Sequence, residues 1–128
     1  MEKYLVTGAD GFIGSHLVEK LVRSGKDVRA MVHYNSFGSN GWLDNIDKKI
    51  FDSIEIISGD IRDAELMKDI ASDCTNIIHL AAMMSIPYSY KAPRTFIETN
   101  VMGTLNILMA AKDLNIQKTI ITSTSEVY

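Results

Sequence analysis

A run of apolar residues that leads directly into three glycines and then into an amphipathic segment constrains this chain more than any other feature. The run covers residues 4–7, and the glycines are Gly8, Gly11 and Gly14. Apolar residues at helical spacing then fall on one face of a predicted helix, Ile13–Ser24. The order strand, glycine turn, helix is the context in which such a spacing predicts a dinucleotide-binding loop.

Each glycine of this motif has a physical role in such a loop. Gly8 lets the chain turn sharply off the strand, Gly11 leaves room for a pyrophosphate beside the backbone, and Gly14 lets the helix pack closely on the sheet. The helix N-terminus then offers unpaired N–H groups to the phosphates. The alternative is a glycine-rich turn without a ligand. A Walker-type phosphate loop is excluded, because neither Lys-Ser nor Lys-Thr follows the last glycine.

The rest of the chain alternates between strand and helix patterns. Further strands are predicted over Asp27–Val32, Ile54–Ser58, Asn76–Leu80 and Lys118–Thr122. Helices are predicted over Ala64–Ala71 (capped by Asp63), Arg94–Leu114 and, as a short one, within Trp42–Phe51. Residues 33–41 and the segment around Pro87 and Pro93 are predicted to be loops. This alternation predicts one α/β domain, a Rossmann-type doubly wound parallel sheet with helices on both faces.

Polar or glycine-rich clusters follow each of the five predicted strands. They cover residues 7–14, 33–36, 59–63, 81–85 and 122–126. The carboxyl ends of parallel strands lie at one edge of a sheet, and ligands of open α/β sheets bind there. We therefore expect the five clusters to converge on one crevice.

The composition limits the classes of function. With 46% apolar residues, the 128-residue chain can form a core, and a formal charge of -3 argues against nucleic acid as a partner. No apolar run is long enough to span a bilayer, so we expect no membrane association, and we expect no metal site. Cys74 is the only cysteine, so no disulfide can form within the chain. Together with an N-terminus that shows no signal peptide, this predicts a cytoplasmic protein.

Five segments, in this order, resemble the motifs of the extended short-chain dehydrogenase/reductase family, which comprises nucleotide-sugar epimerases and dehydratases. They are the glycine motif at 7–14, Gly59-Asp60-Ile61-Arg62-Asp63, His79-Leu80-Ala81-Ala82, Glu98-Thr99-Asn100-Val101-Met102-Gly103-Thr104 and Ser123-Thr124-Ser125-Glu126-Val127-Tyr128. The resemblance is specific because these segments are spread over the whole chain. It implies an NAD(P)-binding Rossmann domain over residues 1–128.

The resemblance assigns most of these residues to cofactor binding. Asp60 would accept a hydrogen bond from the adenine amino group, with Ile61 beside it, or else Asp60 caps a turn. Asn100 would bridge its helix and the backbone of the active site, or else it is a buried, hydrogen-bonded amide. We interpret His79 as a hydrogen-bonded core histidine. The remaining residues would line the cofactor: Gly8, Gly11, Phe12, Ile13 and Gly14 at the pyrophosphate, and Leu80, Ala81 and Ala82 along the strand end.

The end of the second strand bears on which cofactor is used. NAD-preferring members carry an acidic residue there, which binds the ribose 2′-hydroxyl, and residues 30–36 contain no acid. His33, Asn35 and Ser36 could instead receive a 2′-phosphate, as in similar dehydratases that use NADP. We therefore predict that NADP is slightly favoured over NAD as the cofactor, and NAD is the alternative.

For the full-length protein, the resemblance implies oxidation of a nucleotide-linked hexose at C4. Thr124 would hydrogen-bond the C4 oxygen, and Glu126 would remove the C5 proton, as in 4,6-dehydratases, where water is then lost across C5 and C6. The triplet Thr124-Ser125-Glu126 is similar to that of GDP-mannose dehydratases, and other segments resemble UDP-N-acetylglucosamine 4,6-dehydratases. We predict a 4,6-dehydratase acting on a nucleotide sugar, with a UDP-sugar favoured. A 4-epimerase is the alternative, and Glu126 would then be a solvated loop carboxylate.

The Tyr-x-x-x-Lys motif that removes the hydroxyl proton in this family does not occur in the chain. Tyr90 has Arg94 four residues on, and Tyr128 is the last residue. We therefore expect a fragment without its substrate domain, which binds a dinucleotide and turns over nothing by itself. The full-length protein is expected to be a homodimer, with the Arg94–Leu114 helix as a candidate contact, although its apolar stripe could equally face the sheet. A non-catalytic dinucleotide-binding module is a further alternative.

Overall fold

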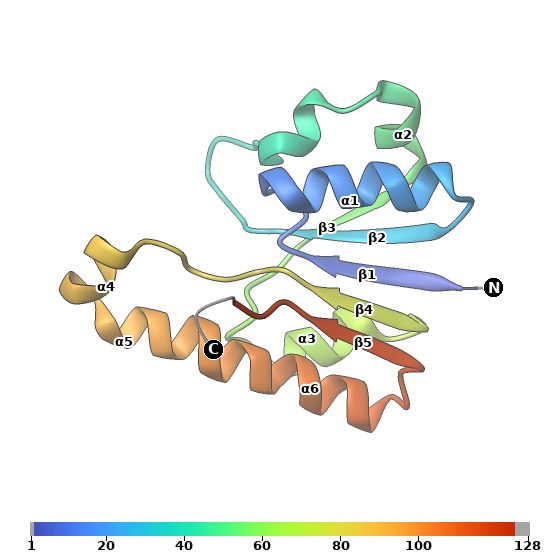
Figure 1. Cartoon of the computed structure of the whole chain (residues 1–128). Helices are drawn as coiled ribbons and strands as arrows, with labels where there is room; N and C mark the ends of the chain where they lie inside the picture. The colour runs from blue at the N-terminus through green and yellow to red at the C-terminus, as the bar shows by residue number, and fades with distance from the viewer. Residues whose placement is uncertain (1, 125–128) are drawn as a thin grey trace.

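Five parallel strands form one open sheet in the computed structural model, which describes residues 2–124 (Figure 1). Strands β2 and β3 lie on one side of β1, and β4 and β5 lie on its other side, so the strand order is β3-β2-β1-β4-β5. The switch point between β1 and β4 is where such sheets bind ligands. The predicted fold class is confirmed. The strands cover Lys3–Thr7 (β1), Asp27–Val32 (β2), Glu55–Ser58 (β3), Asn76–His79 (β4) and Lys118–Ile121 (β5).

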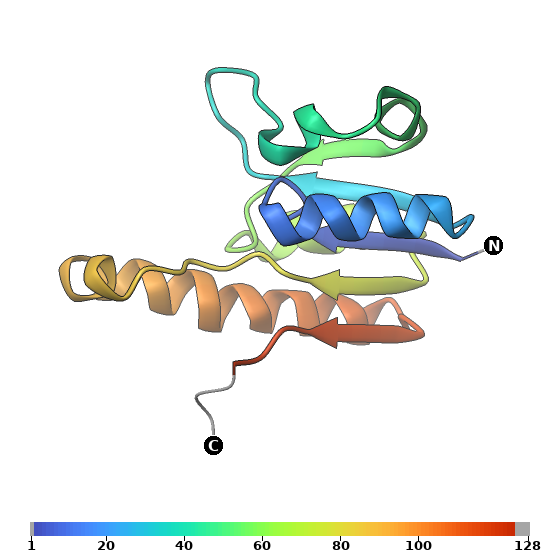
Figure 2. The ribbon, with the colours of Figure 1, turned by 45° about the horizontal axis from the view of Figure 1, so that its top comes forward.

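Helices cover both faces of the sheet (Figures 1 and 2). One face carries α1 (Phe12–Arg23), the 3-10 helix η1 (Gly41–Asn45) and α2 (Lys48–Ser53). The other face carries α3 (Ala64–Ala71) and α6 (Gly103–Asp113). With helices on both sides, β4 is buried along its whole length, as expected of a central parallel strand.

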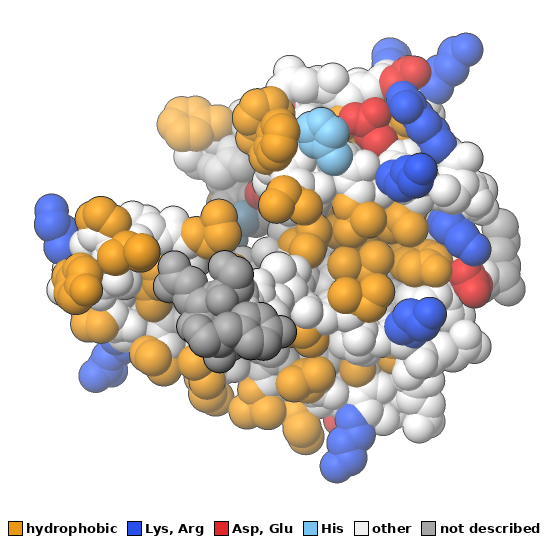
Figure 3. Space-filling view, viewed as in Figure 1, with side chains coloured by type: hydrophobic (Ala, Val, Ile, Leu, Met, Phe, Trp, Pro, Cys, Tyr) orange, Lys and Arg blue, Asp and Glu red, His pale blue; other side chains and the backbone are white. Residues whose placement is uncertain are grey.

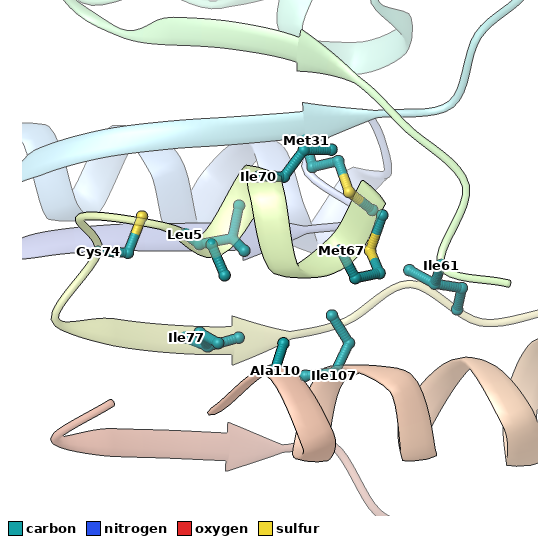
Figure 4. Close-up of a cluster of buried hydrophobic side chains, with 10 residues drawn as sticks. Leu5, Met31, Ile61, Met67, Ile70, Cys74, Ile77, Ile107 and Ala110 are labelled. Atoms are coloured by element: carbon teal, nitrogen blue, oxygen red, sulfur yellow. The ribbon is translucent and has the colours of Figure 1, made fainter. Parts of the chain in front are cut away.

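The core lies in two clusters, one on each side of the sheet. Leu5 of β1 and Ile107 of α6 belong to the cluster beneath α3 and α6 (Figure 4), whereas Val6 of β1 and Val18 of α1 belong to the other. Neighbouring residues of β1 therefore point to opposite faces. Cys74 is a buried free thiol in the first cluster.

Most of the predicted elements are present. β2 and α3 have the predicted bounds, and the Asp63 carboxylate caps α3 by accepting a hydrogen bond from the N–H of Leu66 at 3.0 Å. The short helix predicted within residues 42–51 is instead two helices, η1 and α2. They are separate because the Asp47 side chain caps the first turn of α2, so that a new helix begins there.

One prediction in the segment after β4 is wrong. The region around Pro87 is not a loop but contains α4 (Ile86–Lys91), because the Ser85 hydroxyl caps its first turn and a proline in that turn has no N–H to lose. The predicted long helix is present as one unbroken helical stretch, in which α5 (Pro93–Phe96) continues into the π-helical segment η2 (Ile97–Met102) and then into α6.

The apolar stripe of this helical stretch does not face the sheet. Its members Ile97, Val101, Leu105 and Leu108 are 58, 55, 44 and 45% exposed, whereas Ile107 is fully buried. Figure 3 shows apolar side chains gathered along the lower edge of the view, over α5 and α6. The side of α6 that packs on the sheet is therefore a different one from the predicted stripe.

Candidate functional site

A cleft of about 920 Å³ opens at the carboxyl ends of the strands, at the switch point between β1 and β4. Its walls include the glycine loop from Gly8 to Gly14, the ends of β2 and β3, residues 80–84, Thr99 of η2 and Thr122 after β5. Clusters that are scattered in the sequence therefore meet in one place, as predicted.

The three glycines of the loop meet three different demands. Gly8 has a φ of +67°, and a Cβ added to it would lie 2.7 Å from the backbone nitrogen of Ala81. A Cβ on Gly14 would lie 2.1 Å from the Gly8 carbonyl oxygen, so α1 packs directly on the loop. A Cβ on Gly11 would meet only that same oxygen, at 3.3 Å. Gly11 therefore borders open space in the cleft, where a ligand can approach the backbone.

The first turn of α1 faces this space without a side chain to satisfy it. Gly11 is the N-cap and offers no side-chain hydrogen bond, and no acidic residue lies in the first turn. Phe12 and Ile13 line the cleft and are 58 and 68% exposed. Unpaired N–H groups and the helix dipole both favour an anion at such a terminus. A cradle that a Cβ at Gly11 would partly fill thus fits the pyrophosphate of a dinucleotide.

Asp10, which is not among the predicted site residues, joins the glycine loop to the end of β2. Its carboxylate accepts a hydrogen bond from the backbone N–H of His33 at 3.2 Å, and its carbonyl accepts one from Trp42 at 2.9 Å. Asp10 and His33 both line the cleft. A carboxylate therefore lies at the carboxyl end of β2, although no residue at that end of the strand is acidic. The only sign of this role in the sequence is that an acid lies inside the glycine motif, at a position where the glycine spacing requires no particular residue.

The three residues predicted to receive a 2′-phosphate do not gather in the cleft. His33 lines it, whereas Asn35 and Ser36 do not. The Asn35 amide instead shapes its own loop. Its nitrogen donates to the carbonyl of Ser39 at 2.6 Å, and its oxygen accepts from the N–H groups of Phe37 and Ser39 at 3.1 Å each. The polar atoms of Asn35 are therefore already engaged in holding that loop.

Asp60 lies in the cleft after β3 and pairs closely with Arg62. The guanidinium donates to the Asp60 carboxylate at 2.6 Å, and the Arg62 backbone N–H donates to it at 2.9 Å. The side-chain hydrogen bond from Arg62 lowers the pKa of Asp60 below its usual value, against the opposing effect of burial. Asp60 therefore shapes the turn and also presents an ionised carboxylate to the cleft, with Ile61 beside it in the cleft wall.

Residues 80–83, called the cleft segment below, are held at both ends. At its start, the Thr7 hydroxyl accepts hydrogen bonds from the N–H groups of Leu80 at 3.0 Å and Ala81 at 3.1 Å. At its end, the Asn100 amide accepts from the N–H of Met83 at 2.8 Å and donates to the Met83 carbonyl at 3.0 Å. Asn100 thus bridges η2 and the backbone of the cleft wall. Leu80, Ala81 and Ala82 all line the cleft.

His79, directly before the cleft segment, is a buried histidine with both ring nitrogens engaged. Nδ1 lies 2.7 Å from the Thr7 hydroxyl, and Nε2 lies 3.2 Å from the Thr104 hydroxyl. Burial lowers the pKa of His79 to about 4, so the ring is neutral at pH 7. This is the hydrogen-bonded core histidine that the sequence predicts.

The structure describes one of the two residues that are predicted to be catalytic. Thr124 is exposed, two residues beyond Thr122, which lines the cleft, and Glu126 lies outside the described residues. Their roles stay predictions.

Within residues 2–124, no three His, Cys, Asp or Glu side chains come together as metal ligands. No helix of this described part is long and apolar enough to cross a membrane.

Open parallel sheets that receive a helix N-terminus at their switch point form the class of Rossmann-type dinucleotide-binding domains, and this domain is one of them. Comparison with known proteins narrows the class. The model of the GDP-mannose 4,6 dehydratase family matches residues 5–128. The chain belongs to this family, within the extended short-chain dehydrogenase/reductases that comprise nucleotide-sugar epimerases and dehydratases.

Its relatives are considerably longer proteins. Protein CapI of Staphylococcus aureus is 34% identical over 133 residues, which cover 98% of this chain and 39% of that protein. UDP-glucuronate 4-epimerase 4 of Arabidopsis thaliana is 33% identical over 129 residues, covering 97% of this chain and 29% of that protein. The crystal structure of UDP-glucose 4-epimerase from Bifidobacterium longum in complex with NAD+ and UDP has a TM-score of 0.83 at 27% identity. The superimposed part covers 98% of this chain and 38% of the epimerase chain.

These comparisons bear on two predictions. The solved relative holds NAD+, and the expected slight preference for NADP finds no support. The relatives are named as 4-epimerases more often than as dehydratases, which favours the alternative reading over the 4,6-dehydratase predicted first. The chain covers 39% or less of the length of each of these three relatives.

Proposed function

We propose that this chain is the NAD-binding part of an enzyme that oxidises a nucleotide-linked hexose at C4, and that the full-length protein is a UDP-sugar 4-epimerase. The observation that carries the cofactor proposal is the cleft, in which the uncapped N-terminus of α1, the bare face of Gly11 and the cleft segment surround one space. The choice of a UDP-sugar rests on the relatives, one of which was solved with NAD+ and UDP.

Bound NAD would supply the hydride acceptor, and the residues of this chain would bind and orient it. The N–H groups of the first turn of α1, at Phe12 and Ile13, would hold the pyrophosphate. Asp60 would accept from the adenine amino group, with Ile61 beside it. Leu80 and the two small alanines that follow present apolar side chains, so the cofactor would lie against the strand end there without a polar side chain to desolvate.

The charges around the cleft support NAD rather than NADP. Asp10 places a carboxylate at the end of β2, whereas the ionised carboxylate of Asp60 after β3 is paired with the guanidinium of Arg62. A 2′-phosphate would add a like charge beside Asp10, whereas a ribose 2′-hydroxyl can donate to a carboxylate. His33 is the one predicted phosphate ligand that lines the cleft, and its imidazole is a weaker cation than an arginine at neutral pH.

Titration of the chain with NADH, followed by the fluorescence of the reduced nicotinamide, tests this proposal. We expect saturable binding of NADH that competes with NAD+ and is tighter than binding of NADPH. A folded chain that binds neither dinucleotide would contradict the cofactor proposal. Detectable turnover of a nucleotide sugar by the 128-residue chain would contradict the expectation that it is inactive alone.

A 4,6-dehydratase is the second candidate, favoured by Glu126 in the segment Thr124-Ser125-Glu126. UDP-glucose deuterated at C4, incubated with the full-length enzyme, separates the two. A 4-epimerase returns the label to C4 of the epimeric sugar, and a dehydratase delivers it to C6 of a 4-keto-6-deoxy product. Glu126→Gln should abolish the second reaction, because the carboxylate would be its C5 base, and should leave epimerisation in place.

For the full-length protein we also propose a homodimer in the cytoplasm. The exposed stripe with Val101, Leu105 and Leu108 supports the dimer, because a contiguous apolar surface of this kind marks a contact. Light scattering of wild type and of Leu105→Glu checks it. We expect the charge to shift the equilibrium toward monomer, and a wild-type monomer would contradict the proposal.

A further inference from the structure

Three side chains and one backbone carbonyl, contributed by four residues, form one hydrogen-bonded series behind the cleft segment. Thr7 ends β1, His79 ends β4, and Asn100 and Thr104 lie on η2 and α6. The series runs from the Thr7 hydroxyl to His79 Nδ1 (2.7 Å) and from His79 Nε2 to the Thr104 hydroxyl (3.2 Å). It continues from the Thr104 hydroxyl to the backbone carbonyl of Asn100 (2.6 Å). The two ends of the series, Thr7 and Asn100, are the residues that hold the two ends of the cleft segment.

The positions of the hydrogens in this series follow from counting. The N–H groups of Leu80 and Ala81 both donate to the Thr7 hydroxyl oxygen, that of Leu80 sharing its hydrogen with the Thr7 carbonyl at 3.3 Å, so both lone pairs of the hydroxyl are engaged. Its single hydrogen is therefore left for His79 Nδ1, which must be unprotonated. His79 then carries its proton on Nε2 and donates to Thr104, whose own hydrogen goes to the Asn100 carbonyl. A proton on Nδ1 would bring a third donor to the Thr7 oxygen and leave the threonine hydrogen without an acceptor.

We propose that Thr7, His79 and Thr104 are positioning residues that act with Asn100 as one unit to hold the cleft segment at the spacing the dinucleotide needs. The inference rests on the proposed function and extends it to residues that need not touch the cofactor. The spacing is narrow at its start, where a Cβ on Gly8 would lie 2.7 Å from the Ala81 nitrogen. A small rotation of the Leu80–Ala81 backbone would therefore close or open the cleft wall beside the glycine loop.

Thr104 is the residue whose replacement can distinguish a positioning role from a packing role. Unlike Thr99 in η2, Thr104 does not line the cleft. It is half-buried, and its hydroxyl links His79 to the turn that carries Asn100. Replacing it changes nothing that the cofactor would contact directly. A change in dinucleotide affinity must then come through His79 and Asn100.

The test compares Thr104→Val with Thr104→Ser in the full-length protein, with NADH as the probe. Valine keeps the shape but leaves the Nε2–H of His79 without an acceptor, and we expect an NADH Kd about tenfold weaker. Serine keeps the hydroxyl and should restore the Kd to within about twofold. Ile107→Val is the matched control, because it removes a buried methylene from the same helix outside the series. It should lower stability and leave the Kd unchanged.

Amide hydrogen exchange and histidine NMR keep the test decisive where a variant folds poorly. Thr104→Val should speed exchange at Leu80 and Ala81, and Ile107→Val should not. In the wild type, ¹⁵N shifts of His79 should show the Nε2–H tautomer at pH 6 to 8. An Nδ1–H tautomer, or an NADH Kd in Thr104→Val equal to that of wild type, would overturn the inference. If the wild type binds no NADH, the proposed function fails, and the tautomer and exchange data then decide the inference alone.

Discussion

Arg29 of β2 and His79 of β4 are both buried polar residues in the same sheet, but they are satisfied in opposite ways. Arg29 is 8% exposed and His79 is 4% exposed. Arg29 keeps its charge and pairs with the carboxylates of Glu55 and Asp73. His79 stays neutral and bonds to two hydroxyls. Arg29 lies away from the cleft, beside the loop that leads into β4, whereas His79 lies at the carboxyl end of β4 that borders it.

The partners of Arg29 explain why a charge is tolerated at its end of the sheet. The side chains of Glu55 and Asp73 are 49 and 66% exposed, so the ion pairs reach solvent. Burial alone lowers the pKa of Arg29, but the hydrogen bonds that its guanidinium donates to Glu55 and Asp73 outweigh this effect and raise the pKa. The guanidinium also donates to the backbone carbonyls of Ile70 and Ser72, at 2.6 and 2.9 Å. This cluster therefore ties α3 and the loop after it to the sheet.

The neutral series around His79 instead holds backbone that lines a cleft. A fixed charge there would compete with the dipoles that have to recognise a charged ligand. The comparison teaches that burial of a polar side chain does not reveal its task. The task is shown by the groups that the side chain holds. Arg29 holds side chains and a connecting loop, whereas His79 holds the wall of the binding site. Stability and dinucleotide affinity should therefore respond separately to changes in the two clusters.

Arg29→Leu should have the largest effect on stability of the changes considered. It leaves the Ile70 and Ser72 carbonyls without their donor and removes the hydrogen bonds to Glu55 and Asp73, which we expect to cost about 4 kcal/mol of unfolding free energy. Urea unfolding measures this loss. The NADH Kd of the remaining folded protein should equal that of wild type.

The exposed ion pair of Lys26 and Glu2, at 2.9 Å, provides the matched control for Arg29→Leu. Lys26→Leu should cost far less, because both groups are solvated. An Arg29→Leu variant as stable as Lys26→Leu, or one with a weakened NADH Kd, would break the distinction drawn between the two clusters.

Acid should destabilise the fold through His79. The pKa of this histidine is about 4 in the folded state and 6.5 as the ordinary value, so the unfolded chain binds a proton between these values that the folded chain does not. Stability is therefore full above about pH 6.5 and falls as the pH is lowered toward 4, by up to roughly 3 kcal/mol. Urea midpoints between pH 7 and 4 measure this fall. In His79→Gln the fall should be smaller by about that amount, and an identical pH profile would show that His79 does not titrate on unfolding.

The sequence predicts the fold and the location of the cleft well, because both depend on local patterns. The apolar periods around Gly8, Gly11 and Gly14 fix strand, turn and helix, and parallel topology then brings the strand ends together. The hydrogen-bonded series could not be predicted in this way. It joins Thr7 to His79 and Thr104, which are far apart in the sequence, and a threonine carries no local signal of such a partner.

Two further misses have equally specific causes. The apolar stripe of the long helix is exposed because α6 buries Ile107 and Ala110 instead, and periodicity alone cannot say which apolar face meets the sheet. The acid at the end of β2 could not be predicted from residues 30–36, because it is supplied by another part of the chain. Asp10 reaches that position from the glycine loop, through a contact across 23 residues of sequence.

Gly11→Ala should separate binding from stability inside the glycine loop. Gly11 has φ -80° and ψ 172°, which alanine adopts freely, so stability should rise or stay within about 1 kcal/mol. Its methyl group would stand where the pyrophosphate has to approach, and we expect the NADH Kd to weaken about tenfold. Gly8→Ala is the contrasting variant, because its φ of +67° and the nearby Ala81 backbone strain any side chain. Unchanged NADH binding in Gly11→Ala would remove the pyrophosphate from this face of the loop.

Asp10→Asn should have the smallest effect, and it tests whether charge at the cleft end of the sheet selects the cofactor. Asparagine keeps an oxygen that can accept from the N–H of His33, 3.2 Å from the carboxylate in the wild type, so the loop should stay in place. Loss of the negative charge should improve the affinity for NADPH relative to NADH by about threefold, because repulsion at this range is partly screened. Competition titrations at low and high salt measure the ratio. If the ratio does not change, the Asp10 carboxylate does not face the 2′ position. Discrimination would then fall to Asp60 or to the shape of the loop after β2.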